Sequence, residues 1–358
     1  MFRRAIVLAT LTASSMITAL PAAQAACTGR WTELPGAEPL GVEGIAALAQ
    51  DDAWNVGTDT DGNDHGRAYH WDGVGWTEVP IPGGVTEYIW GIGAIAPHDV
   101  WIVGDWQETR TSGWEAYAAY WDGSRFVQTP VDAGPFPRLF DADGVASDDA
   151  WAVGFHAGDH GLRSLAMHWD GVGWTEVATP APSRAWTYLH DVSAFATDDV
   201  WAVGYIEGRR KGRRPLAMHW DGATWTRTWP VNPPESLFTG VAATARNRAW
   251  AVGYSDAGAL IERWNGSEWR RVGVPDAGRS SSLGGVSAVS RREAWAVGGA
   301  SHTGPLLYRW NGTSWRSVDV PGVNHGYVAK VVSAPDGTSF ALGYSGGQAL
   351  PLQRCPPA

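Results

Sequence analysis

The sequence predicts an all-β protein built from seven similar units, each made of four short antiparallel strands. The first observation is composition: the 358 residues include 45 glycines, 22 prolines and 23 tryptophans, while only 18% are charged. So much glycine and proline interrupts helices, and so much tryptophan requires burial, which excludes disordered, coiled-coil and ordinary helical proteins. The second observation is an internal repeat, which sets the number of units.

The repeated segment is typified by residues 199–204 (DVWAVG) and recurs at spacings of 47, 50, 50, 49, 45 and 45 residues. Its aromatic anchors are Trp54, Trp101, Trp151, Trp201, Trp250, Trp295 and Phe340. Within each unit, four apolar runs separated by turn signals predict a four-stranded antiparallel blade. In the fourth unit we expect these strands, a to d, at 189–196, 200–205, 214–220 and 224–229.

A Trp-Asp/Asn-Gly hairpin joins the last two strands of most units, because Asp-Gly and Asn-Gly supply the left-handed turn conformations. It occurs at Trp71, Trp121, Trp169, Trp220, Trp264 and Trp310. A lone blade exposes both faces and its edges, so the blades must stack and the ring must close. The last unit stops at residues 353–355, before its fourth strand, and residues 30–35 (RWTELP) match 75–80 (GWTEVP). The sequence therefore predicts a seven-bladed β-propeller whose last blade is completed by the N-terminal strand.

With its Trp/Phe-anchored units and Asp-Gly hairpins, the chain from about Cys27 onward resembles secreted bacterial seven-bladed β-propellers. The broad group includes kelch, Asp-box and propeller-lectin proteins. The hairpin matches an Asp-box only in part, because the Ser and Thr of that motif are placed differently. The Trp-Asp pairs lack the Gly-His partner of a WD40 blade. The resemblance implies a fold and leaves function open, because propellers host lectins, enzymes and scaffolds.

The N-terminus has the pattern of a secretory signal peptide over residues 1–25. Arg3 and Arg4 precede an apolar stretch at 5–20, and residues 23–25 (AQA) form a small-residue cleavage site. We therefore expect a single propeller domain over 26–358 and a secreted protein, extracellular or in the cell envelope. No later apolar run is long enough to span a bilayer.

Without Arg3 and Arg4 the chain carries 25 basic and 37 acidic residues, a formal charge of −12. A net negative charge argues against nucleic acid and anionic lipid as partners. The one basic run, at 209–214 (RRKGRR), is either a local patch for an anionic ligand or a solvated loop.

The two cysteines of the chain, Cys27 and Cys355, fall on the two sides of the interrupted last hairpin. In an oxidising compartment we expect them to form a disulfide, and with only two cysteines this pairing has no rival.

Eighteen of the 23 tryptophans occupy repeat positions, where we expect them to pack between blades. Five remain, and all lie in or beside the d-to-a and b-to-c connections, which share the upper face of the ring: Trp90, Trp106, Trp114, Trp186 and Trp229. By the same count Tyr88, Phe140, Tyr188 and Tyr205 lie on that side. Such rings offer flat apolar faces to a sugar, and the alternative is packing of loop residues under one another.

Strand a lines the central channel, so its first residues should form the upper mouth. Most units have Gly or another small residue there, and the departures are Glu43, Asp141, His190, Asp191 and Lys330. Two carboxylates from adjacent blades are suited to share a cation, to act as an acid/base pair or to hold sugar hydroxyls. The alternative is that backbone N–H groups at the blade edge satisfy them.

Calcium is a weaker prediction. Residues 59–64 (DTDGND) have the oxygen density of a calcium loop, through Asp59, Asp61 and Asp64, but lack the EF-hand spacing and its closing Glu. No other cofactor is implied.

Three functions follow from these residues. The first is a carbohydrate-binding, lectin-like module that uses the aromatic upper face. The second is an enzyme, a hydrolase, lyase or cyclase, with one site at the channel mouth formed by Asp141, His190 and Asp191. The third is a protein-interaction scaffold. The candidate residues do not recur from blade to blade, which favours a single asymmetric site.

Overall fold

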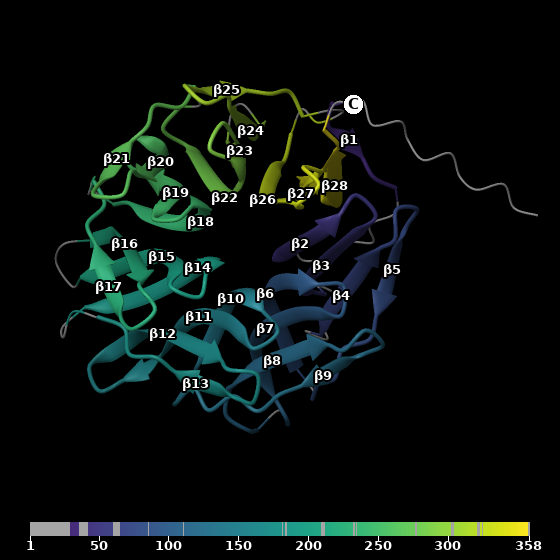
Figure 1. The fold of residues 1–358 in the computed structure, drawn as a ribbon, viewed down its shortest axis with the longest axis vertical. Helices are drawn as coiled ribbons and strands as arrows, with labels where there is room; N and C mark the ends of the chain where they lie inside the picture. The colour runs from purple at the N-terminus through teal and green to yellow at the C-terminus, as the bar shows by residue number, and fades with distance from the viewer. Residues whose placement is uncertain are drawn as a thin grey trace, which may run out of the picture.

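The computed structural model describes residues 29–35, 42–59, 65–84, 86–109, 111–180, 182, 185–208, 212–231, 233, 235–275, 278–301, 304–320, 323 and 325–356. These residues form 28 strands and no helix, arranged as seven four-stranded antiparallel sheets around a central channel (Figure 1). The predicted seven-bladed propeller is confirmed. Among the described residues, no helix is long and apolar enough to cross a membrane.

The first four blades follow chain order from the channel outward. Blade 1 is β2 (Gly44–Ala49), β3 (Asp52–Thr58), β4 (Gly66–Trp71) and β5 (Trp76–Val79). Blade 2 is β6 (Thr86–Ala96), β7 (Asp99–Gln107), β8 (Glu115–Trp121) and β9 (Phe126–Gln128). Blade 3 is β10 (Arg138–Ala146), β11 (Asp149–Gly158), β12 (Gly161–Trp169) and β13 (Trp174–Glu176). Blade 4 is β14 (Trp186–Ala196), β15 (Asp199–Gly208), β16 (Gly212–Trp220) and β17 (Trp225–Thr228).

The other three blades complete the ring. Blade 5 is β18 (Leu237–Ala245), β19 (Arg248–Ser255), β20 (Gly258–Trp264) and β21 (Trp269–Arg271). Blade 6 is β22 (Ser281–Ser290), β23 (Glu293–Ala300), β24 (Gly304–Trp310) and β25 (Trp315–Ser317). Blade 7 is β26 (Tyr327–Ser333), β27 (Ser339–Ser345), β28 (Gln348–Arg354) and β1 (Thr32–Glu33).

The N-terminal strand closes the ring, as the sequence predicts. Thr32 of β1 pairs with Gln353 of β28 in antiparallel register, and the two strands lie side by side in Figure 1. Trp31 packs edge-on against Trp295 of blade 6, with ring centroids 5.2 Å apart. Cys355, directly after β28, is buried. Cys27 lies outside the described residues, so the disulfide stays a prediction.

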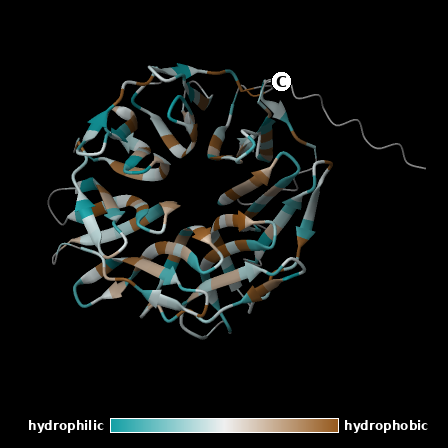
Figure 2. Ribbon diagram, in the orientation of Figure 1, coloured by the Kyte–Doolittle hydropathy of each residue, from teal (hydrophilic) through white to brown (hydrophobic). Residues whose placement is uncertain are grey.

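The repeated tryptophans stack each blade on the one before it. Trp151 of blade 3 meets Trp220 and Trp225 of blade 4, with ring centroids 5.0 and 5.1 Å away. The same contact joins Trp201 to Trp264 and Trp269 of blade 5. Burying three indoles at each such junction removes a large apolar area from water, which drives the blades together. In Figure 2 the inner strands are mostly brown and white along their length, as expected for sheets packed on both faces.

The inner three strands of blade 4 are longer than the sequence predicts. Strand a starts at Trp186 and strand b reaches Gly208, and the pairing of Trp186 with Glu207 carries the a–b ladder three residues further toward the upper face. Hydrogen bonding between the two backbones continues past the apolar core, so apolar runs mark only the central part of each strand. Asp191 therefore lies in the middle of β14, inside the channel, and not at its mouth as predicted.

Candidate ligand-binding sites

A β-bulge recurs at one position of strand a in six of the blades. The ladder skips one residue there, as between Leu189 and Asp191 in blade 4, and the skipped residue is re-aimed by the local bend. The skipped residues, from blade 2 to blade 7, are Trp90, Phe140, His190, Thr239, Gly284 and Ala329. Blades 2 to 4 thus carry rings at this level of the channel, and blades 5 to 7 carry small side chains. The upper mouth is asymmetric for this reason.

These rings belong to a continuous aromatic belt, which consists of Tyr88, Trp90, Trp114, Phe140, Phe155, Tyr188, His190 and Tyr205. Phe140 and His190 stack with centroids 4.8 Å apart, and His190 stacks in turn on Tyr205 at 5.5 Å. Much of each ring face is therefore covered by a neighbouring ring. The belt unites most of the aromatic residues singled out in the sequence, and much of their surface is used for packing.

A buried carboxylate fixes the first ring of the belt. Trp90 Nε1 donates a hydrogen bond to Asp105 Oδ1 at 2.6 Å, and Arg138 Nη2 donates to Asp105 Oδ2 at 3.3 Å. Arg138 Nε forms an ion pair with Oδ1 at 2.8 Å. The Arg138 guanidinium also lies 4.9 Å from the Trp90 ring centroid. Burial raises the pKa of Asp105, while the charge of Arg138 opposes that rise. No sequence pattern identified Asp105 or Arg138 as partners of Trp90.

The other three unexplained tryptophans lie elsewhere. Trp106 packs edge-on against Tyr117 with centroids 6.4 Å apart. Trp186 lies so close over Gly161 that a Cβ at residue 161 would fall 2.0 Å from its Nε1. Trp229 is 72% exposed at the end of blade 4. The one-sided aromatic surface predicted from the sequence is thus divided into the belt and three separate positions.

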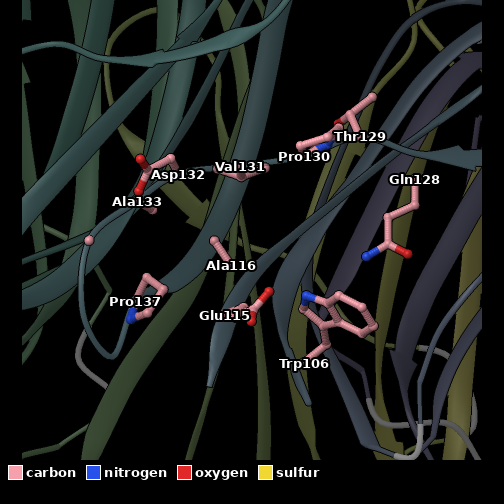
Figure 3. A pocket seen from close by; sticks show the side chains of 11 residues that line it. Trp106, Glu115, Ala116, Gln128, Thr129, Pro130, Val131, Asp132, Ala133 and Pro137 are labelled. Carbon is pink, nitrogen blue, oxygen red and sulfur yellow. The ribbon is translucent and has the colours of Figure 1, made fainter. Parts of the chain in front are cut away.

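Trp106 lines a cavity of about 580 Å³ between blade 2 and the connection to blade 3, which we name the Trp106 pocket (Figure 3). Its polar groups are Glu115, Gln128 and Asp132, and Pro130 and Pro137 contribute apolar surface. Glu115 lies directly across the ladder from Trp106. Within the described part of the chain, neither Glu115 nor Asp132 has a hydrogen-bond or ion-pair partner. The pocket therefore offers an indole and two unpaired carboxylates to a ligand.

Sequence reasoning found Trp106 and missed the rest of this pocket. A comparison of equivalent positions in the repeat could have identified Glu115 and Gln128. Glu115 and Gln128 occupy the positions in blade 2 that Arg214 and Arg227 occupy in blade 4, so their identity changes from blade to blade.

A second cavity, of about 430 Å³, follows the channel from the level of Asp191 toward the a–b turns. Asp141, Asp191 and Lys330 lie at one end of it, and Lys330 Nζ is 3.8 Å from Asp191 Oδ1. Both carboxylates also accept backbone N–H groups of the following blade. Val192 N donates to Asp141 Oδ2 at 3.2 Å, and Val241 N donates to Asp191 Oδ2 at 2.6 Å. One oxygen of each carboxylate is therefore bound by a backbone N–H group, which was the alternative to a ligand-binding role.

The two carboxylates differ in the charges that surround them. Burial, and then the charge of Asp191, raise the pKa of Asp141 well above its usual value. Burial also raises the pKa of Asp191, but Lys330 opposes that rise. Burial by itself lowers the pKa of Lys330, and the carboxylates of Asp191, Asp141 and Glu43 outweigh it and raise that pKa. The pKa of Asp141 is thus raised beside a carboxylate, Asp191, that faces the Lys330 ammonium. His190 stays neutral at pH 7, because burial lowers its pKa to about 4.

The predicted calcium loop is only partly described. Asp61 and Asp64 lie outside the described residues. Asp59 forms an ion pair with Arg67, with Oδ2 2.9 Å from Arg67 Nη2, and also accepts the backbone N–H of His65. In the part of the chain that the structure describes, no three His, Cys, Asp or Glu side chains are grouped to hold a metal ion.

No family model matches this chain, and no curated protein matches it. Solved structures of propellers do match. YCF48 from Cyanidioschyzon merolae is 13% identical, with 91% of this chain and 98% of that chain covered and a TM-score of 0.61. The GH74 xyloglucanase from Xanthomonas campestris is 15% identical, with 90% and 53% covered and a TM-score of 0.62. The WD40 propeller domain of Doa1 is 11% identical, with 91% and 96% covered and a TM-score of 0.58.

These similarities show the propeller fold and nothing finer. The neighbours are YCF48, WD40 and GH74 structures, so the kelch, Asp-box or lectin type expected from the hairpins is not confirmed. A YCF48 structure bound to a D1 peptide and a xyloglucanase share this fold, which shows that the scaffold serves both binding and hydrolysis in other proteins.

Proposed function

We propose that this protein is an exported carbohydrate-binding module, and that the sugar occupies the Trp106 pocket. The observation that carries the proposal is the combination of an indole with two unpaired carboxylates and an amide around one cavity. An indole face packs against the apolar C–H side of a sugar ring. Carboxylates accept hydrogen bonds from sugar hydroxyls, and the Gln128 amide both donates and accepts.

The size of the pocket fits this class of ligand. Its volume of about 580 Å³ lies in the range of small-molecule sites, which is large enough for one or two sugar rings. Its wall is formed by a strand pair and a proline-containing connection, so it is largely pre-formed. The signal-like residues 1–25 lie outside the described residues, and export is part of the proposal.

The test is a screen of neutral oligosaccharides followed by calorimetric titration of the best binder. Trp106→Ala should weaken binding at least about tenfold, in line with the loss of a buried aromatic contact. Glu115→Gln should weaken it less, because the amide still accepts a hydrogen bond. The matched control is Trp186→Ala, which removes a half-exposed tryptophan outside the pocket. The proposal fails if no neutral oligosaccharide binds, or if Trp106→Ala binds as tightly as the wild type.

A second candidate function, an enzyme in the channel, is favoured by one observation. Asp141 and Asp191 are adjacent buried carboxylates in different surroundings: the charge of Asp191 raises the pKa of Asp141, whereas the charge of Lys330 opposes the rise in the pKa of Asp191, and such a difference suits an acid/base pair. The hydrogen bonds from Val192 and Val241 give the same residues a role in holding blades together. A substrate-turnover screen with Asp141→Asn as control tests this candidate.

A further inference from the structure

The same place in the repeat carries different charges in different blades. It consists of the paired position of strands b and c that lies five residues after the strand-b tryptophan, and of a position on strand d, close to the upper face. In blade 1, Arg67 binds both Asp59 and Glu78 there, at 2.9 and 2.6 Å. In blade 3, His156 lies 3.7 Å from Glu176. These charges of the two blades are thus paired within the fold, and Arg163, the blade 3 equivalent of Arg214, donates to the carbonyl oxygen of Pro182.

Blade 4 has two arginines at this place. Arg214 lies across the ladder from Ile206, and Arg227 lies across from Met218. Arg214 and Met218 are four residues apart on β16, so both arginines are on one face of the sheet. Among the described residues no hydrogen bond or ion pair includes either guanidinium, and Arg227 Nε is buried without a partner. Burial, and then the charge of Arg214, lower the pKa of Arg227.

Two unpaired guanidiniums are unusual in a chain whose charge is −10. Buried charges are normally paired, because desolvation without a counter-charge costs free energy. An anion between Arg214 and Arg227 would remove both the repulsion and the unsatisfied donor.

An exposed ring adjoins this pair. Trp229 follows β17 and is 72% exposed, and the Arg227 guanidinium lies 4.1 Å from its ring centroid. A large exposed aromatic side chain beside unpaired cations is typical of a binding surface, because neither contributes to the core. The equivalent residue in blade 2 is Pro130, which lines the Trp106 pocket.

We propose that Arg214, Arg227 and Trp229 form a binding site for a carboxylated sugar, a uronate residue of an acidic oligosaccharide. The guanidiniums bind the carboxylate through paired N–H donors. The free face of Trp229 packs on the sugar ring. The site is separate from the Trp106 pocket and does not depend on it. Nucleic acid is a poor alternative, because its extended charge would be repelled by the net negative protein.

The test is calorimetric titration of the folded protein with trigalacturonic acid and with its methyl ester, which has the same sugars without the charge. The acid should bind and the ester should bind at least about tenfold more weakly. Arg214→Gln and Arg227→Gln should each weaken binding of the acid by about tenfold or more, since hydrogen bonds to charged groups are the strong ones. Trp229→Ala should weaken binding of both ligands.

The matched control is Arg271→Gln, which removes the exposed arginine at the place in blade 5 that corresponds to Arg227. It should leave binding of the acid within about twofold of wild type. Thermal melts should show the three site variants folded, because the side chains are exposed or half-buried and the one contact among them, Arg227 over the Trp229 ring, lies outside the core. A neutral oligosaccharide that binds the Trp106 pocket should be unaffected by Arg227→Gln, so the two sites can fail separately.

Three results would overturn the proposal. One is equal binding of the acid and the ester, and another is no binding of the acid. The third is tighter binding of hexaglutamate than of trigalacturonic acid with no effect of Trp229→Ala, which would make the site one for acidic peptides.

Discussion

Asp191 of blade 4 accepts the backbone N–H of Val241 in blade 5 through Oδ2, at 2.6 Å, while its other oxygen faces Lys330 of blade 7. One carboxylate thus links an adjacent blade and a distant one across the channel. The same kind of contact recurs two residues further along strand a. Asp143 accepts the backbone N–H of Ala194, and Ser193 accepts that of Ala243. The strands of neighbouring blades do not pair with each other, so side-chain oxygens in the channel accept backbone N–H groups of the next blade instead.

Replacing Asp191 with Ala should destabilise the protein by roughly 3 kcal/mol, because it leaves the Lys330 charge and the Val241 N–H unsatisfied in the channel. Asp191→Asn should cost less, since the amide oxygen still accepts from Val241. Urea unfolding of both variants measures the difference. Equal stability of Asp191→Ala and wild type would show that these contacts contribute nothing to the fold.

Asp143 should make stability depend on pH. Burial raises its pKa to about 6, above its usual value of 3.8, so the folded protein binds more protons than the unfolded chain between about pH 4 and pH 6. Its contribution to stability is present below about pH 4 and is lost as the pH rises through 6. Asp143→Asn should remove this loss, so the variant should gain in melting temperature relative to wild type as the pH rises from 4 to 7.

The control for this experiment is His190. Its pKa is lowered to about 4, so between about pH 4 and pH 6.5 the unfolded chain binds the extra proton and stability rises with pH. The two residues act in opposite directions. His190→Phe should therefore make the decline with pH steeper, and a flat difference between wild type and Asp143→Asn would contradict the assignment.

Asp199 accepts three hydrogen bonds and joins blade 4 to blade 5. It accepts from His219 Nε2 at 2.8 Å and from Trp201 Nε1 at 3.1 Å, and its second oxygen accepts from Asn247 N in blade 5. Asp199→Ala should cost roughly 2–4 kcal/mol, because three buried or half-buried donors lose their acceptor.

The comparison is Asp52, the same position in blade 1, which binds His70 at 2.9 Å and is more exposed. Asp52→Ala should cost roughly 1 kcal/mol. Denaturant unfolding of the two variants checks the order, and a larger loss for Asp52→Ala would contradict this account.

The predicted Cys27–Cys355 disulfide would close almost the whole propeller into one loop. In the chain-entropy model such a loop stabilises the fold by about 5–6 kcal/mol, an upper value. Intact mass before and after reduction should differ by two hydrogens, and Cys27→Ser should lower the melting temperature as much as the double replacement of both cysteines. Alkylation of both thiols in the unreduced, unfolded protein would disprove the bond.

The fold could be predicted from sequence because its signals are local and repeated. Aspartate or asparagine followed by glycine determines each hairpin within four residues, and the apolar run around Trp201 identifies a strand without knowledge of its neighbours. The strand ends were less predictable, as at Trp186, because pairing continues wherever two backbones remain in register. The channel acids Asp141 and Asp191 were identified as departures from the repeat. Their hydrogen bonds to the next blade were one of the alternatives left open.

By itself the sequence determined the number of blades, their four strands and the closure of the ring by residues 32–33. Only the tertiary structure decided which unexplained side chains meet. It joined Phe140 to His190 and left Trp106 beside Glu115. It also brought Arg214 toward Arg227 with no ion-pair partner among the described residues. The physical reason is that strand formation depends on neighbouring residues in the chain, whereas these contacts depend on bulges and on packing between elements distant in sequence.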